Sequence, residues 1–176
     1  SDHGSHFKTR NGEYKRSCHD GCTHIPMVAW GPGFRGGREV DAMASLIDVP
    51  PTLLHAAGAN VPAPMQGRPL QETVDGPPED WPEDVFIQIS ESHCGRAVAT
   101  KRWKYSVRAA DADKMDPHAE TYIEDFLYDL EEDPHERNNL VDDPQYADVR
   151  ADMRGRLTRH MRQAHEPEAA IVPAQK

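Results

Sequence analysis

A segment rich in proline, glycine and acidic residues, 61–83, divides this sequence into two parts. Because proline and glycine interrupt helices and strands, we expect a linker or a long surface loop there. The apolar runs on either side are short, and none approaches the ~18–20 residues that a helix needs to cross a membrane. The 176 residues are therefore predicted to form the end of one domain followed by a small second domain.

The part before this segment shows one strand pattern and one helix pattern. Residues 26–30 form a short apolar run closed by Gly31-Pro32-Gly33, which predicts a buried strand that ends in a turn. A helix is predicted over 48–57, because Asp48 can cap it, two prolines fit its first turn and Gly58 follows its end.

The part after the segment reads as strands followed by a helix. Strands are predicted at 85–90, 96–107 and 127–130, and a helix is predicted over 143–161. Its apolar residues recur at helical spacing and are expected to pack in the core: Tyr146, Val149, Met153, Leu157 and Met161. The order of elements indicates the end of an α/β sheet followed by a small α+β subdomain.

The charge balance limits the partners of the chain. The net charge is -10, from 30 acidic and 20 basic residues. Nucleic-acid binding normally leaves a basic footprint, which this composition does not provide. An anionic substrate would have to be held by a local positive site made of a metal ion, lysine or arginine.

Such a site is suggested by the first residues of the chain. Asp2 and His3 stand side by side before Gly4, and Lys15 follows within a short loop. Carboxylate and imidazole can both bind a divalent cation, and a lysine nearby would add a second positive charge facing a dianionic ester. From the residues alone, an ordinary solvated loop also explains this sequence. Since the sequence opens in the middle of this motif, we expect it to be the C-terminal piece of a larger enzyme.

The three cysteines do not describe a disulfide framework, because their number is odd. Cys18 and Cys22, together with His19 and His24, offer ligands that suit zinc. However, the spacing is C-x3-C and no second cysteine pair follows. We therefore favour small buried side chains beside a functional loop over a zinc cluster.

An ordered set of short motifs resembles the second half of the sulfatase catalytic domain and the subdomain that follows it. The first part comprises Ser1-Asp2-His3-Gly4, Lys15 with His19-Asp20, His24-Ile25-Pro26, Gly31-Pro32-Gly33, residues 45–54 and Gln66-Gly67-Arg68-Pro69-Leu70. The second part comprises Arg96-Ala97-Val98, Arg102-Trp103-Lys104-Tyr105 and residues 127–134 with Glu136, Asn138 and Leu140. No single motif is decisive, whereas the ordered set is specific.

The resemblance implies a fold and a division of the chain. The fold would be the C-terminal part of an alkaline-phosphatase-like α/β sandwich, followed by an α+β subdomain with antiparallel strands and a C-terminal helix. Residues 1–82 would close the catalytic domain, residues 83–165 would form the subdomain and residues 166–176 a tail. By analogy with the family, the protein would be periplasmic or extracellular.

The resemblance also implies a chemistry, the hydrolysis of a sulfate ester, with a sulfated carbohydrate as one candidate substrate. Asp2 and His3 map onto metal ligands, and the metal would be calcium, with manganese as the alternative because His3 stands where many relatives have asparagine. Lys15 maps onto the lysine that contacts the sulfate group. Family members use a formylglycine made within a C-x-P-x-R or S-x-P-x-R motif; these 176 residues contain neither, so this segment alone is expected to be inactive.

Four further residues have predicted supporting or substrate-binding roles. His19 and His93 are candidates for contacts with the substrate. Asp20 and His24 are expected to support the site structurally.

Two other functions remain open from the sequence. One is a phosphodiesterase or phosphonate monoester hydrolase of the same superfamily. The other is a binding module that has the fold without the catalytic nucleophile. It is less favoured, because half of a central sheet would expose strand edges.

Overall fold

The computed structural model describes residues 1–90, 93–109 and 116–174. Its contacts divide the chain into two compact units, one made of Ser1–Ile25 with Phe86–Lys176 and the other of Pro26–Val85. The first unit is therefore discontinuous in sequence. None of the helices in the described part of the chain is both long and apolar enough to cross a bilayer.

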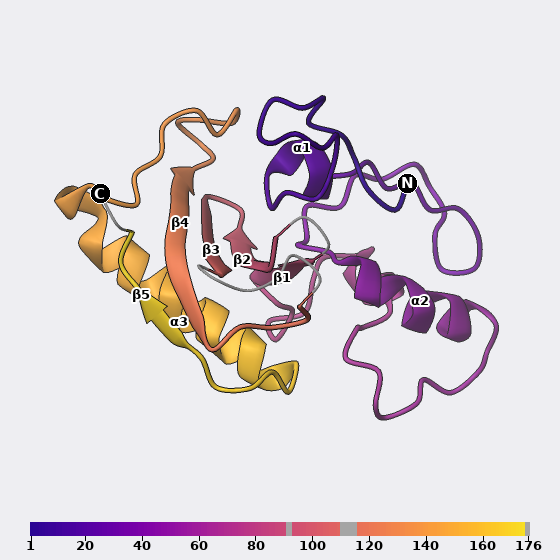
Figure 1. Ribbon diagram of the computed structural model, residues 1–176. Helices are drawn as coiled ribbons and strands as arrows, with labels where there is room; N and C mark the ends of the chain where they lie inside the picture. Colours follow the sequence, from indigo (N-terminus) through magenta and orange to yellow (C-terminus); the bar gives the residue numbers. More distant parts are fainter. Residues whose placement is uncertain (91–92, 110–115, 175–176) are drawn as a thin grey trace. The chain divides into compact units, whose positions relative to one another are not determined.

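The first unit is organised around a five-stranded sheet in the order β1-β2-β3-β4-β5 (Figure 1). The strands are β1 (Asp84–Ile89), β2 (Gly95–Thr100), β3 (Trp103–Ala109), β4 (Thr121–Asp129) and β5 (Ala170–Val172). β2, β3 and β4 pair antiparallel in sequence order, and β5 joins β4 in parallel. The predicted antiparallel subdomain is thus confirmed, and the short β5 lies within the predicted tail.

The strand predicted at 96–107 is a hairpin in the structure. β2 and β3 are separated by Lys101 and Arg102, and the hydroxyl of Thr100 accepts a hydrogen bond from the backbone N–H of Trp103 at 2.8 Å. The sequence offers neither glycine nor asparagine at the turn, so the usual hairpin signal is missing. The strand predicted at 127–130 overlaps the end of the longer β4.

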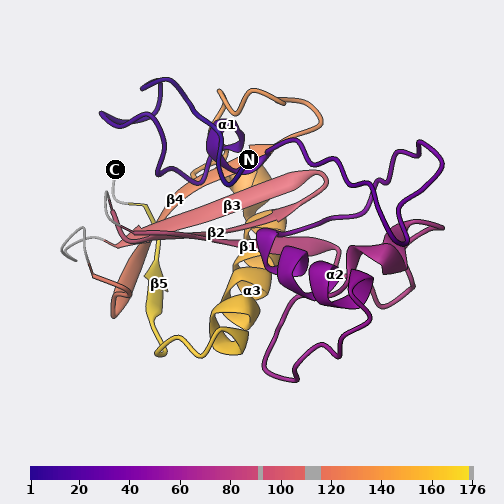
Figure 2. The ribbon, with the colours of Figure 1, turned by 90° about the vertical axis from the view of Figure 1, so that its right-hand side faces the viewer.

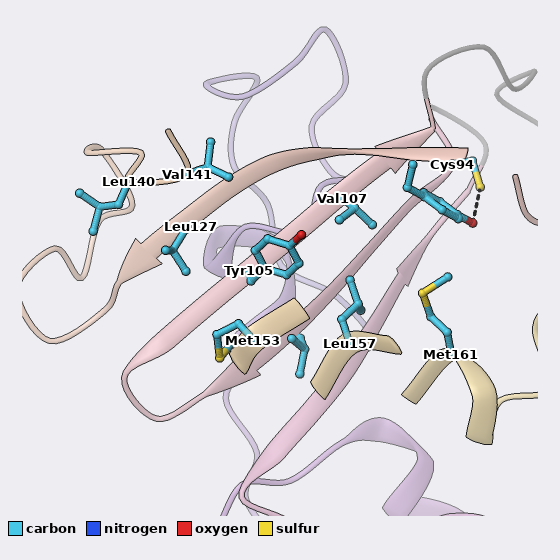
Figure 3. Close-up of a cluster of buried hydrophobic side chains, with 11 residues drawn as sticks. Cys94, Tyr105, Val107, Leu127, Leu140, Val141, Met153, Leu157 and Met161 are labelled. Carbon is cyan, nitrogen blue, oxygen red and sulfur yellow. Dashed lines mark hydrogen bonds between the residues drawn. The ribbon is translucent and has the colours of Figure 1, made fainter. Parts of the chain in front are cut away.

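Helix α3 (Ala147–Gln163) covers one face of the sheet, as Figures 1 and 2 show. The 3-10 turn Pro144–Tyr146 leads into it, and the carboxylate of Asp143 accepts a hydrogen bond from the backbone N–H of Gln145. The predicted apolar stripe is confirmed, because Met153, Leu157 and Met161 are buried against the sheet. In Figure 3 these side chains face Tyr105, Val107 and Leu127 of the strands, and Cys94 contacts the hydroxyl of Tyr122.

The opposite face of the sheet is covered by the N-terminal segment, which contains the short helix α1 (Asp20–Thr23) (Figure 2). Cys18 is buried there among Ala97, Phe126 and Tyr128. The sheet therefore has an apolar face toward α3 and a mixed face toward the segment that carries Lys15.

The second unit contains helix α2 (Val49–Ala56) and the 3-10 helices Leu46–Asp48 and Leu70–Thr73. The predicted helix is confirmed, but Asp48 acts one turn earlier than expected, since its carboxylate accepts the backbone N–H of Ser45 at 2.8 Å. The same carboxylate accepts the backbone N–H of Arg68 at 2.9 Å, so it also anchors the chain after α2.

The strand predicted at 26–30 is not formed among the described residues. Val28 and Trp30 are 96% and 90% exposed, although both are large and apolar. An extended segment becomes a strand only when another backbone pairs with it, and no strand of the described chain pairs with residues 26–30.

Candidate functional site

The structure brings Lys15 and His3 into contact. The Nζ atom of Lys15 lies 3.2 Å from Nε2 of His3, although twelve positions separate the two residues in sequence. The Oδ2 atom of Asp2 lies 3.9 Å from the same ring nitrogen, and the Asp2 side chain is 87% exposed. The residues predicted to be metal ligands and the predicted sulfate-binding lysine therefore form one small cluster.

The imidazole of His3 is oriented by the backbone carbonyl of the next residue. Its Nδ1 atom donates to the carbonyl oxygen of Gly4 at 2.7 Å, which leaves the lone pair on Nε2. A histidine held in this way is ready to bind a metal ion through the other nitrogen. In the described structure that nitrogen accepts a hydrogen bond from Lys15, so a cation at Nε2 would take the place of this hydrogen bond.

Buried contacts fix the backbone around Lys15. His6 is buried, its Nε2 lies 3.2 Å from the carbonyl oxygen of Lys15, and its backbone N–H donates to the carbonyl oxygen of Tyr14 at 3.0 Å. The ring of Tyr14 lies 5.7 Å from the ammonium of Lys15. Sequence reasoning did not select His6, and a lone histidine in a charged loop gives no signal for this role.

Gly4 makes a second contact that supports the site, next to His3. Its N–H donates to the carbonyl oxygen of Cys22 at 2.9 Å, and a Cβ atom at Gly4 would overlap the carbonyl oxygen of Gly21. Only glycine permits this approach of two backbones. The segment that carries Asp2 and His3 is thereby held against α1.

His19 lies against the sheet rather than beside Lys15. Its ring centroid is 4.5 Å from that of Phe126, its Nδ1 is 2.8 Å from the hydroxyl of Ser17, and its Nε2 is 3.4 Å from the hydroxyl of Tyr128. Burial, followed by the positive charges of Arg10 and Lys104, lowers the pKa of His19 to about 3. His19 is therefore a neutral hydrogen-bonding group at neutral pH, which disfavours a role as proton donor.

His93 lies near the start of β2, next to Gly95. Burial lowers its pKa, and the charges of Asp125 and Arg108 act on it in opposite directions. Arg108 lies on β3, four residues after Lys104. Lys104 pairs with Tyr128 of β4. The predicted role of His93 in substrate binding stays a prediction.

Metal ligands are incomplete in the described chain. No group of three or more His, Cys, Asp or Glu side chains that could hold a metal ion occurs in residues 1–90, 93–109 and 116–174. The Asp2–His3 pair fits a divalent cation chemically, but it supplies only two ligands. Cys18 and Cys22 are buried and unpaired with other cysteines, and burial raises the pKa of Cys18 to about 12.

A family model matches most of the chain. Residues 12–163 match the model of "N-sulphoglucosamine sulphohydrolase, C-terminal". The chain belongs to this sulfatase family. The resemblance seen in the sequence motifs is confirmed.

Known sulfatases are similar to the chain over most of its length. It is 30% identical over 152 residues to arylsulfatase K of Xenopus laevis, covering 80% of this chain and 27% of that protein. It is 31% identical over 172 residues to the Delta 4,5-hexuronate-2-O-sulfatase of Bacteroides thetaiotaomicron, covering 89% of this chain and 32% of that protein. The sulfatase-family chain thus spans about a quarter to a third of the length of these relatives.

Solved structures support the fold. A putative sulfatase from Bacteroides thetaiotaomicron matches with a TM-score of 0.76 and 27% identity, over 93% of this chain and 35% of that one. A phosphonate monoester hydrolase from Silicibacter pomeroyi matches with a TM-score of 0.73, over 92% of this chain and 33% of that one. Its 21% identity shows a shared fold alone. The expected fold class, a sulfatase-type α/β fold with a C-terminal helix, is confirmed.

Proposed function

We propose that this chain forms the C-terminal part of a metal-dependent sulfatase that hydrolyses a sulfate ester of a sulfated carbohydrate. The observation that carries the proposal is the contact between Lys15 Nζ and His3 Nε2 at 3.2 Å, with the Asp2 carboxylate beside it. Membership of the sulfatase family and 31% identity to a hexuronate-2-O-sulfatase support the substrate class.

In this proposal Lys15 is the catalytic residue of the segment. Its ammonium group would bind the sulfate oxygens and stabilise the negative charge that builds on them and on the leaving oxygen. His6 and Tyr14 support this role, because their contacts fix the backbone from which the Lys15 side chain extends. His19 and His93 would contact the organic part of the substrate as neutral hydrogen-bonding groups.

Asp2 and His3 would hold a divalent cation, either calcium or manganese, together with ligands from outside these residues. Such an ion supplies charge stabilisation for the sulfate oxygens. The nucleophile, a formylglycine in the proposed mechanism, would also come from outside the 176 residues. What this chain contributes is an oriented imidazole nitrogen, a carboxylate and a lysine placed together.

The test is a comparison of substrates with the protein expressed from its complete reading frame. We expect release of sulfate from sulfated uronic-acid disaccharides, with kcat/KM at least about tenfold higher than for the corresponding aryl phosphonate and phosphate esters. Faster cleavage of the phosphonate would instead assign the protein to the phosphonate hydrolases. A folded protein that binds the disaccharide without releasing sulfate would identify a binding module.

A further inference from the structure

A lysine is fully buried on the sheet face that carries the candidate site. Lys104, on β3, has no solvent exposure, and its Nζ donates to Oε1 of Glu136 at 2.9 Å and also contacts the carboxylate of Asp20. Lysine is almost never fully buried unless it is paired. Its two partners are 116 residues apart in sequence, one from α1 and one from the loop after β4.

Glu136 extends these contacts to the backbone of the N-terminal segment. Its Oε2 accepts the backbone N–H of Asp20 at 2.9 Å, and Nη2 of Arg10 lies 4.0 Å from the same oxygen. Arg10 also donates to the carbonyl oxygen of His135 at 2.7 Å. Arg10, Asp20, Lys104 and Glu136 thus form a cluster with two positive and two negative charges, referred to below as the charge cluster.

Two members of the charge cluster flank the stretch of chain that contains Lys15. Arg10 and Asp20 stand on either side of residues 11–19, which include Lys15 and His19. Both ends of this stretch are therefore attached to the loop that contains Glu136, while Cys18 is buried against the sheet between them. Lys104 itself is too deeply buried to touch a substrate.

We propose that Lys104 and Glu136 are positioning residues, which hold residues 11–19 on the sheet so that Lys15 keeps its place in the site. The inference rests on the proposed sulfatase function for its catalytic consequence, and on the contacts alone for its structural one. A buried ion pair is often no more stable than apolar residues of similar volume, so stability is a weak reason for keeping this one. Its hydrogen bond to the backbone of Asp20 gives it directional control, which an apolar contact lacks.

The charge cluster is also separate from the main core. That core lies between the sheet and α3 and contains Tyr105, whereas Lys104 is the preceding residue of β3 and so points to the opposite face. Disrupting the charge cluster should therefore release residues 11–19 and leave α3 packed on the sheet. This separation makes a local effect distinguishable from general unfolding.

The structural arm uses the ring of His19 as a reporter in the 176-residue chain. The groups that act on its pKa are Arg10, Lys104, His6 and Asp20, besides burial. In the variant Glu136→Gln, loss of a negative charge alone would leave the pKa of His19 unchanged or lower it. Release of the segment into water would raise the pKa toward ~6.5, its ordinary value. We expect the rise, measured by NMR titration of the ring, with amide protection in α3 retained.

Two further variants complete this arm. Arg102→Gln removes a charged partner of Asp129 in the turn between β2 and β3, and it should leave the pKa of His19 unchanged. If Glu136→Gln does not fold, Glu136→Asp keeps the negative charge and draws the carboxylate back from Lys104 and from the backbone N–H of Asp20. An unchanged or lowered pKa of His19 in a folded charge-cluster variant overturns the proposal.

The catalytic arm is a double-mutant cycle in the protein expressed from its complete reading frame. We expect Glu136→Gln to lower kcat/KM for the sulfate ester about tenfold, and to have less than about a twofold effect when Lys15 is already alanine. Effects that multiply in full would overturn positioning of Lys15. If the unmodified protein cleaves no sulfate ester, the proposed function fails, and the His19 titration still decides whether the charge cluster holds the segment.

Discussion

Gly4 lies so close to Gly21 that a Cβ atom at Gly4 would overlap the carbonyl oxygen of Gly21. The hydrogen bond from Gly4 to the carbonyl oxygen of Cys22, 2.9 Å long, requires this approach. His3 directly precedes the contact, so its imidazole is placed by the packing of one backbone on another. Any side chain at Gly4 must move either His3 or α1.

The variant Gly4→Ala should therefore damage the site while leaving the α3 core folded. We expect kcat/KM of the complete protein to fall at least about tenfold, because small displacements of reacting groups are costly. Gly12→Ala is the matched control, since a Cβ atom there would meet nothing within 4 Å. Equal activities of the two variants would show that the position of His3 does not depend on this contact.

Replacement of Lys15 tests the charge that we propose to face the sulfate. Lys15→Ala should lower kcat/KM for the sulfate ester by about 100-fold or more, because a preorganised donor to developing negative charge is lost. Lys8→Asn removes an exposed lysine of the same loop and suits its φ of 63°, so it should change activity less than about twofold. Steady-state kinetics of both variants makes the comparison, and a loss no larger for Lys15→Ala than for Lys8→Asn would refute the assignment.

Metal binding should depend on both residues of the Asp2–His3 pair. We expect the complete protein to retain calcium or manganese through purification, and Asp2→Ala or His3→Ala to lower the bound metal severalfold, as measured by elemental analysis. His118→Ala, which changes an exposed histidine, should not alter it. Full occupancy in both site variants would place the metal elsewhere.

His19 should make stability depend on pH in a defined direction. Its folded-state pKa, lowered to about 3, lies below the ordinary value near 6.5, so the unfolded chain takes up a proton first as the pH falls. The stability linked to His19 is therefore complete above pH ~6.5 and is lost progressively toward pH ~3. The ring is partly exposed, so screening reduces the effect, and we expect roughly 1–2 kcal/mol between pH 7 and pH 4.

The check is urea unfolding of the chain and of His19→Asn at both pH values. Carboxylates titrate in the same range, so the quantity of interest is the difference between the two proteins. The variant should lose less free energy of unfolding on acidification. An identical loss in both proteins would mean that folding does not lower the pKa of His19.

Much of the fold could be predicted from local patterns in the second part of the chain. The spacing of Met153, Leu157 and Met161 identified α3 and its buried side, because helical periodicity depends on the segment alone. The turn at Lys101 and Arg102 was missed, since its hydrogen bonds use Thr100 and no special turn residue. The prediction of a strand at 26–30 was wrong, because a strand needs a partner backbone to pair with, and a local pattern does not reveal that partner.

The candidate site could be predicted only in part. Asp2, His3 and Lys15 were selected through a resemblance, and the structure brings them together in one cluster. The charge cluster was missed, although a lysine between Trp103 and Tyr105 in an inner strand calls for a buried acidic partner. Which acid it would be cannot be read from the sequence, because Glu136 approaches Lys104 only after the turn that follows β4.

The discontinuity of the first unit has a consequence for folding. The strands from β2 to β4 and α3 are close in sequence, so they can form early, whereas Ser1–Ile25 must return to them across the excursion of residues 26–85. Residues 1–25, which carry the candidate site, are therefore expected to dock last and to be the first part to open in native-state hydrogen exchange. In this protein the residues that would bind the substrate would belong to the least protected part of the unit. The rate at which they dock onto the sheet would determine when a newly made chain can bind its substrate.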